Sequence, residues 1–198
     1  MLHSMSEAPG SSRTDFHLGV AVAIVAALVA IVDLVGNHIG DEELIATEEK
    51  VSAYLWYQSK GIKESQAEGQ RDLLHALVIG GAVSSDHRAE IDALVAANAS
   101  DVARYAQEKR AILEGGSVDG NAVVGARAFE KRAQRLSSAG DLLDVAMLFL
   151  HLALLLGGVG VAVQHRQLER VLLRIVVAGA GLGVLLACAS GIVWLASS

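Results

Sequence analysis

The sequence contains one cysteine, one proline and only 4% aromatic residues in 198 positions. A single cysteine excludes a small module held by disulfides, and 16 Lys and Arg against 22 Asp and Glu exclude a strongly basic nucleic-acid binder. The scarcity of proline favours long helices, because proline disrupts a helix interior. Hydrophobic residues make up 53% of the chain, which excludes a disordered protein and is high beside 19% charged residues unless the apolar residues are grouped.

The apolar residues are grouped in three blocks, and each approaches or exceeds the roughly 20 residues that a helix needs to cross a bilayer. We therefore predict an all-α membrane protein with three transmembrane helices. The predicted segments are a polar tail at 1–15, helix one at 16–36, an extramembrane region at 37–140, helix two at 141–163, a short arginine-containing loop at 164–174 and helix three at 175–196. The alternative for the first block is a cleaved signal peptide, but no small-x-small cleavage site precedes a clear mature start, and this favours a retained helix.

Arginines near the membrane ends predict the orientation, because short cytoplasmic loops are enriched in Lys and Arg. Four of them favour a cytoplasmic N-terminus: Arg13, Arg166, Arg170 and Arg174. Four other basic residues favour the opposite orientation: Arg127, Lys131, Arg132 and Arg135. Short loops orient a chain more reliably than long ones, so we expect a bacterial inner-membrane protein with residues 37–140 on the periplasmic or extracellular side.

The region 37–140 is predicted to form polar helices that pack on themselves or on copies of themselves, as a coiled-coil-like hairpin or stalk. The first is expected to begin near Gly40-Asp41 and to end at Gly80-Gly81. Its apolar stripe consists of Leu44, Ile45, Val51, Leu55 and Ile62. The apolar run 73–83 is too short to span a membrane, and it predicts a buried helix end rather than a re-entrant segment.

A second helix is expected to begin at Ser84-Ser85-Asp86, with Glu90 as the acidic partner of its cap, and to end at Gly115-Gly116. Its stripe consists of Ile91, Leu94, Val95, Val102 and Tyr105. A third helix is expected from about Asn121 and continues into the second membrane helix without a break.

The segment Leu55-Trp-Tyr-Gln-Ser-Lys-Gly-Ile-Lys63 resembles a signature of the bacterial DUF4337 family, a domain of unknown function. The family's signature is similar to Trp-x-Tyr-Gln-Ala-Lys-Ser-Ile-Lys, and this chain differs in having adjacent Trp56 and Tyr57 and in having Gly61 where Ser is common. The resemblance implies the same layout: one membrane helix, a long charged helical region, then two membrane helices joined by an arginine-rich turn. It implies no activity.

Within this segment Trp56, Tyr57, Gln58, Lys60 and Lys63 form a candidate interaction motif. Trp and Tyr combine a large apolar ring with a polar group, which suits protein contacts. The two lysines can pair with acidic residues of a neighbouring helix. The simpler interpretation, which we favour, is that the motif forms the packing seam of the hairpin.

Two sets of residues in the membrane blocks are further candidates. Gly179, Gly183, Ala187 and Gly191 recur every four residues, the small-xxx-small spacing that lets another helix approach closely, within one chain or between chains. Asp33, Asp144 and His151 are ionisable residues in or beside the membrane, where such residues often bind cations or relay protons. The alternative is that the aspartates lie solvated at helix ends and that His151 hydrogen-bonds a backbone or a neighbouring helix.

The sequence contains no paired cysteines and none of the common zinc, phosphate-loop, dinucleotide or serine-hydrolase motifs. We therefore expect a protein that is not an enzyme, holds no cofactor or metal and binds no nucleic acid. Its expected partners are the lipid bilayer and copies of itself or subunits of a larger complex. The leading hypothesis is a self-assembling scaffold or accessory subunit. The alternatives are a cation- or proton-conducting channel and, less favoured, an enzyme or electron-transfer subunit.

Overall fold

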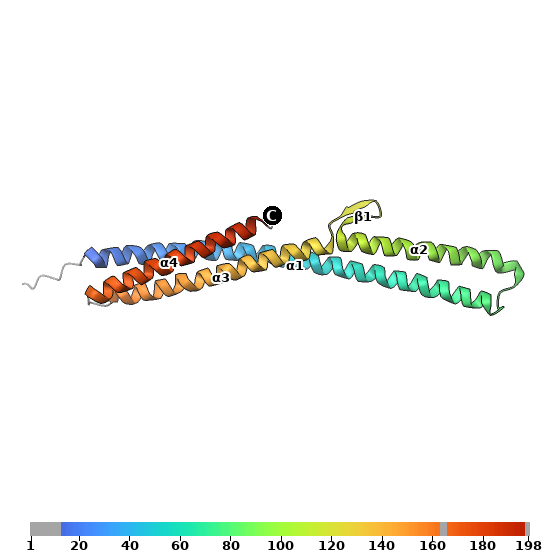
Figure 1. Cartoon of the computed structure of the whole chain (residues 1–198), viewed down its shortest axis with the longest axis horizontal. Coiled ribbons are helices and arrows are strands. Elements are labelled where there is room, and N and C mark those ends of the chain that lie inside the picture. The colour runs from blue at the N-terminus through green and yellow to red at the C-terminus, as the bar shows by residue number, and fades with distance from the viewer. Residues whose placement is uncertain (1–12, 163–165, 197–198) are drawn as a thin grey trace, which may run out of the picture. The chain divides into compact units, whose positions relative to one another are not determined.

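The computed structural model describes residues 13–162 and 166–196, and these residues are almost entirely helical (Figure 1). In chain order the elements are α1 (Arg13–Ile79), a short 3-10 helix (Ser85–His87), α2 (Arg88–Glu114), β1 (Gly116–Val118), β2 (Asn121–Val123), α3 (Ala126–Ala162) and α4 (Arg166–Leu195). Three of the helices, α1, α3 and α4, are long and apolar enough to cross a membrane. The predicted all-α fold with three candidate spans is therefore confirmed.

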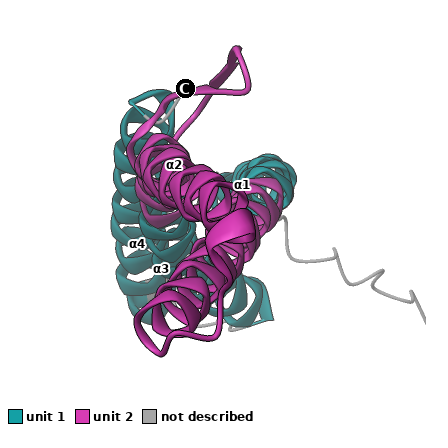
Figure 2. Cartoon of the chain, turned by 90° about the vertical axis from the view of Figure 1, so that its right-hand side faces the viewer, with its two compact units in different colours: residues 1–43, 135–198 teal, residues 44–134 magenta. Residues whose placement is uncertain are grey.

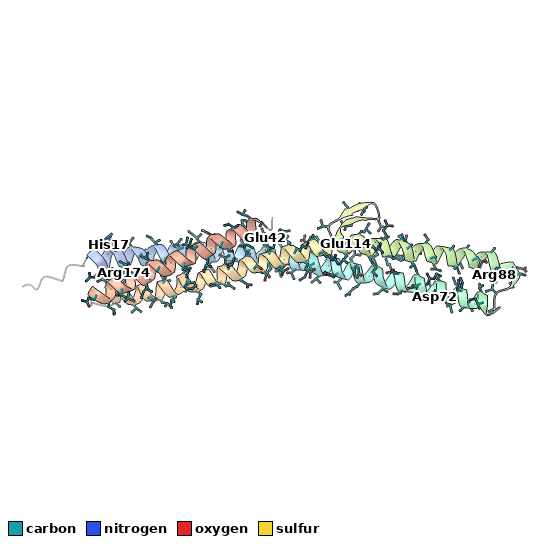
Figure 3. All side chains as sticks on the ribbon, viewed as in Figure 1. His17, Glu42, Asp72, Arg88, Glu114 and Arg174 are labelled. Carbon is teal, nitrogen blue, oxygen red and sulfur yellow. The ribbon has the colours of Figure 1, made fainter. Side chains whose placement is uncertain are left out.

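The chain divides into two compact units (Figure 2). Residues 1–43 and 135–198 form the first unit, which we call the bundle, and residues 44–134 form the second, which we call the hairpin. The helical part of the bundle consists of the N-terminal part of α1, most of α3 and all of α4. Within it, His17 and Arg174 lie toward one end and Glu42 toward the other (Figure 3).

In the bundle, the buried residues of α1 recur every seven positions, at Leu18, Val25, Val32 and Ile39. Those of α3 alternate in steps of three and four residues: Leu136, Ala139, Leu143, Ala146, Leu150 and Ala153. Both spacings bring one face of a helix repeatedly against its neighbours. Many large aliphatic side chains instead point outward, such as Leu34 and Leu148, which suits helices surrounded by lipid.

In the hairpin, the second half of α1 lies beside α2 (Figure 1). Near the turn that joins the two helices lie Asp72 and Arg88 (Figure 3). The turn follows from glycine: Gly81 has φ 70°, and the amides of Gly81 and Ala82 donate to the carbonyls of Val78 and Leu77. This pattern satisfies the last carbonyls of a helix and requires a left-handed residue. The predicted end of the helix at Gly80-Gly81 is correct.

Several predicted boundaries are wrong. No helix begins at Gly40, because α1 continues through Gly36 and Gly40 without a break. A glycine costs about 1 kcal/mol in a helix, and the packing of the nearby buried residues Val32 and Ile39 offsets this cost. Arg13 already belongs to α1, whereas α3 passes through residue 141 without a break, as predicted for a helix that continues into the second membrane segment. The predicted loop at 164–174 is largely helical, since α4 begins at Arg166, while 1–12, 163–165 and 197–198 lie outside the described residues.

The start of α2 also differs from the prediction. A 3-10 turn occupies Ser85–His87, α2 begins at Arg88, and the Ser84 side chain makes no capping hydrogen bond, although Glu90 does lie in the first turn. The end at Gly115 is as predicted. The run 73–79 ends a helix as expected, but it is not buried, because Leu73 and Ile79 are exposed.

Candidate functional site

The hairpin buries an ion pair at its centre. Lys60 of α1 and Glu108 of α2 are only 9% and 7% exposed, and Lys60 Nζ lies 2.5 Å from Glu108 Oε2. Lys60 occupies this position because it lies fourteen residues after the buried Ala46 and seven before the buried Ala67, on the face of α1 that meets α2. Removing two charges from water is costly, and the close pairing offsets that cost.

Further groups surround this pair. Arg104 Nε lies 3.8 Å from Glu108 Oε1, and Asp119 Oδ2 lies 3.9 Å from Lys60 Nζ. The ring of Tyr105 faces both cations, with its centroid 5.8 Å from Lys60 Nζ and 4.7 Å from Arg104 Cζ. Asp101 lies 2.9 Å from the Arg104 guanidinium, and its charge raises the pKa of Arg104. The pair therefore lies within a small network of alternating charges.

A second contact between the same helices lies one turn farther along α1. Lys109 Nζ donates to Glu64 Oε2 at 2.7 Å, and this hydrogen bond raises the pKa of Lys109 above its usual 10.5. The ring of Tyr57 lies 5.1 Å from the same ammonium and packs against the small core of Ala111, Ile112 and Val118. The two ionic contacts join successive turns of α1 to consecutive residues of α2, and together they favour one longitudinal register of the two helices.

A two-stranded hairpin, β1–β2, supplies Asp119 to the network. Val118 pairs with Asn121, so Asp119 and Gly120 form the two-residue turn, with φ values of 52° and 80°. Positive φ at both positions is the turn that Asp-Gly favours. The predicted start of the third helix near Asn121 is therefore wrong, because α3 begins only at Ala126. Asp-Gly between Ser117-Val118 and Asn121-Ala-Val123 is the sequence signal that identifies this element.

Gly125 then joins β2 to α3. A Cβ on this residue would overlap the backbone of Glu114 and Gly115, so only glycine permits so close an approach between the end of α2 and the start of α3. Nearby, Tyr54 Oη donates to Glu130 Oε2 at 3.2 Å. Desolvation raises the pKa of Tyr54, and the hydrogen bond to Glu130 raises it further.

The predicted motif residues thus take different positions. Lys60 and Tyr57 lie in the α1–α2 seam, as described. Trp56 is partly exposed and lines a cavity of about 480 Å³ with Val123 and Phe129. Gln58 lines a shallow hollow of about 650 Å³, and Lys63 is exposed.

In the bundle, Asp33 of α1 and Asp144 of α3 line one cavity of about 270 Å³, together with Asn37 and Gly140. Both aspartates are exposed. His151 does not line this cavity, and its Nδ1 lies 2.9 Å from the Met147 carbonyl oxygen of its own helix. The structure therefore brings the two aspartates together and places His151 apart from them.

The predicted small-residue stripe packs α4 on α3 of the same chain over part of its length. A Cβ on Gly183 would lie 2.8 Å from Leu150 Cγ and 3.1 Å from the Ala146 carbonyl oxygen, and one on Gly179 would lie 3.5 Å from Ala153 Cβ. Ala187 is half-buried, whereas Gly191 has open space around it. On α3, Gly157 and Gly160 allow the same close approach to Val22 and Leu18 of α1, a contact that the sequence analysis did not identify.

The polar contacts at the end of α4 were also not predicted from the sequence. Trp194 Nε1 donates to Glu42 Oε2 at 3.2 Å, and the ring of His38 lies edge-on to Trp194. The Arg135 guanidinium donates to the Ala196 carbonyl at 2.7 Å, and buried Ser190 donates to the Ala139 carbonyl at the same distance. A tryptophan at the end of an apolar block, a common feature of membrane boundaries, is the signal that could have indicated them.

Among the described residues, no group of three or more His, Cys, Asp or Glu side chains is placed to hold a metal ion.

Comparison with known proteins gives one match. A sequence model of the family described as "Domain of unknown function (DUF4337)" matches residues 15–190, which include the whole hairpin and most of the bundle. The resemblance that we identified from the segment 55–63 is thereby confirmed. No curated protein and no solved structure matches the chain.

Proposed function

Because the chain belongs to the DUF4337 family, whose description assigns no activity, we propose its function from the geometry: it is a membrane-anchored scaffold without enzymatic activity. In this proposal α1, α3 and α4 anchor the chain in a bacterial inner membrane. The hairpin lies on the periplasmic or extracellular side, where it associates with copies of the chain or with subunits of a larger complex.

The observation that carries the proposal is the buried pair of Lys60 and Glu108. A buried ion pair contributes little net stability compared with apolar packing, but it penalises every register in which one charge is buried alone. Together with Lys109 and Glu64, it favours one alignment of α1 on α2. A hairpin held in one register presents a defined surface, which is the property that a scaffold needs.

The packing of the bundle supports the proposal that the bundle anchors the chain while the hairpin binds other chains. Its helices approach one another through Gly157, Gly160 and Gly183 of the same chain, so these small residues are already occupied by contacts within the chain. We therefore expect assembly between chains to use other surfaces. The surface of the hairpin, which lies outside the membrane in this proposal, is the one that we assign to this role.

The test is the mass of the intact protein in lipid nanodiscs prepared from native membranes. We expect assemblies larger than the 20.7 kDa chain, either of several copies or with companion proteins. Lys60→Met, which leaves Glu108 only its longer contact with Arg104, should reduce the assembled fraction. A monomer that captures no companion would contradict the scaffold proposal.

A second candidate function is cation or proton conduction by an oligomer, and one observation favours it: Asp33 and Asp144 share a cavity. Paired carboxylates beside the membrane attract cations. Conductance of the reconstituted protein should then fall several-fold in Asp144→Asn, with Asp141→Asn as the matched control. Absence of current under voltage, acid pH and membrane tension would contradict this function.

The proposed orientation has its own test. Cysteine introduced at Asn98, in the hairpin, should react with a membrane-impermeant maleimide in intact spheroplasts, in a chain whose Cys188 is replaced by serine. Cysteine introduced at Gln167 should react only after lysis. The reverse pattern would show that the hairpin is cytoplasmic.

A further inference from the structure

One face of α1 in the hairpin is exposed and carries no charge over 27 residues. It consists of Val51, Ser52, Leu55, Gln58, Ser59, Ile62, Gln66, Gly69, Gln70, Leu73, Ala76 and Leu77, and all twelve are exposed. We call this surface the uncharged face. It includes three side chains of the predicted stripe, Val51, Leu55 and Ile62, which are therefore not buried against α2.

The position of this face follows from helix geometry. Each residue turns an α-helix by about 100°, so Leu55 lies about half a turn from Ala46, and Val51 lies about half a turn from Lys60. Ala46 and Lys60 are both buried, and Lys60 pairs with Glu108 of α2. The centre of the uncharged face is therefore directed away from α2, while Gln58, Ile62 and Gln66 also border the shallow hollow next to Lys109.

Its composition differs from that of the rest of the same helix segment. Six charged residues lie between positions 51 and 77, and all are outside the face: Lys60, Lys63, Glu64, Glu68, Arg71 and Asp72. Meanwhile Leu55, Ile62 and Leu73 are each about 60% exposed. Loss of charge from the centre of a surface, with large apolar side chains left in place, is typical of a protein interface.

We propose that this face pairs with the same face of a second copy of the chain, with the two α1 helices parallel and in register. The proposal rests on the scaffold function above and specifies its contact surface. Copies inserted in one membrane have the same orientation, and Leu55 follows the first apolar block by the same number of residues in each. Equal positions of two copies therefore meet at equal heights.

The absence of charge on this face supports a second copy of the chain, rather than another protein, as its partner, because the face can meet itself without charge repulsion. In a parallel two-fold pair each central residue lies against its own counterpart, so any charged residue there would repel itself. The uncharged face contains only side chains that avoid this repulsion. Leu55 and Ile62 pack on their equivalents, and the amides of Gln58 and Gln66 both donate and accept hydrogen bonds.

The spacing of the face suits long, nearly straight pairing. Val51, Ile62 and Leu73 lie eleven residues apart, as do Leu55, Gln66 and Leu77. An eleven-residue repeat corresponds to 3.67 residues per turn, close to the natural 3.6, so the face does not rotate away from its partner over the length of the segment.

The decisive experiment is a charge exchange at Leu55 in the full-length protein in nanodiscs. Leu55→Glu and Leu55→Lys, each expressed alone, should reduce the paired fraction about tenfold, because like charges then meet. Co-expression of the two variants should restore pairing, since Glu then meets Lys. Leu94→Glu, on an exposed leucine of α2, is the matched control and should leave pairing unchanged. Circular dichroism checks that all variants keep their helicity.

A crosslink identifies the register. In a chain whose Cys188 is replaced by serine, Leu55→Cys should form a disulfide between copies under mild oxidation, and Leu94→Cys should not. Assembly that persists in Leu55→Glu and gives no crosslink at position 55 would overturn the proposed face but leave the scaffold function intact. A monomeric wild-type chain without companions would overturn both. A different protein that is bound to the wild type and released by Leu55→Glu would overturn the second copy as the occupant.

Discussion

In the bundle, most positions buried between helices carry small or aliphatic residues such as Gly157, Ala146 and Leu18, with Glu169 and Ser190 of α4 as polar exceptions. In the hairpin, the buried positions include the ion pair of Lys60 and Glu108. Both units use helices with regularly spaced inward residues. With the bundle in lipid and the hairpin in water, as we propose, the solvent explains the difference. Lipid gives no hydrophobic drive for helices to associate, so the bundle gains from close backbone approach. In water, burial of apolar groups is favourable in many registers, and a buried ion pair selects one of them.

The two tryptophans make this comparison measurable, because Trp56 lies in the hairpin and Trp194 in the bundle. Trp194→Phe leaves a fluorescence signal from the hairpin alone, and Trp56→Phe leaves one from the bundle alone. In nanodiscs, denaturation followed with these two variants reports the two units separately. The predictions below use them in order of decreasing effect.

Lys60→Met should have the largest effect, and only on the hairpin. Loss of the cation leaves Glu108 buried without its partner, which typically costs about 3–5 kcal/mol. The midpoint followed by Trp56 should fall, while the one followed by Trp194 should not change. The double variant Lys60→Met, Glu108→Leu should recover most of the loss. Equal stability of the single variant and the wild type would show that the pair does not select the register.

Gly183→Ile should destabilise the bundle and leave the stability of the hairpin unchanged. Its Cβ would approach Leu150 and the fixed carbonyl of Ala146, and overpacking of this kind costs about 1–3 kcal/mol. The Trp194 signal should report a weaker bundle, with the Trp56 signal unchanged. Gly181→Ile is the matched control, because a Cβ there has no contact within 4 Å. An equal effect of both variants would mean that α4 does not pack through Gly183.

Two glycines of the hairpin should respond with opposite signs. Gly120 has φ 80°, so Gly120→Ala strains the β-turn and should destabilise the hairpin by about 1 kcal/mol. Gly69 is an open helical position, and Gly69→Ala should stabilise it by about 0.5–1 kcal/mol. The Trp56 denaturation curve measures both. Destabilisation by Gly69→Ala would contradict the open helical position assigned to this residue.

The smallest effect is expected from alkaline pH. The pKa of Lys109 is raised in the fold by its hydrogen bond to Glu64, so its contribution is complete below about pH 10.5 and is lost as the pH rises through the raised value. For a pair that is partly exposed to solvent this amounts to about 0.5 kcal/mol. Tyr54, whose pKa is also raised, contributes with the same sign. The alkaline fall in Trp56-reported stability should be shallower in Lys109→Gln, and an unchanged slope would contradict this assignment.

The features that follow from local sequence were predictable. Three apolar blocks gave the candidate spans, and Gly80-Gly81 and Gly115 gave two helix ends. The boundary at Gly40 was not predictable in this way, because glycine lowers helix propensity by only about 1 kcal/mol and packing of Ile39 outweighs it. The Asp119-Gly120 turn had a readable signal, whereas the pairing of Lys60 with Glu108 depends on two residues 48 positions apart. Periodicity also identified the stripe through Leu55 but could not show that it faces away from α2.

The double ionic contact between α1 and α2 has a consequence for how the hairpin can vary in length among relatives. A deletion in only one of the two helices, between the Lys60–Glu108 pair and the turn at Gly80-Gly81, would shift α1 along α2. The charged residues of α1 would then no longer lie opposite their partners on α2. Seven residues correspond to almost two helical turns, so a loss of seven in α1 matched by seven in α2 would preserve both the pairing level and the facing sides. Insertions and deletions in this part of the family should therefore occur as matched pairs in the two helices, and unpaired ones should be confined to the turn.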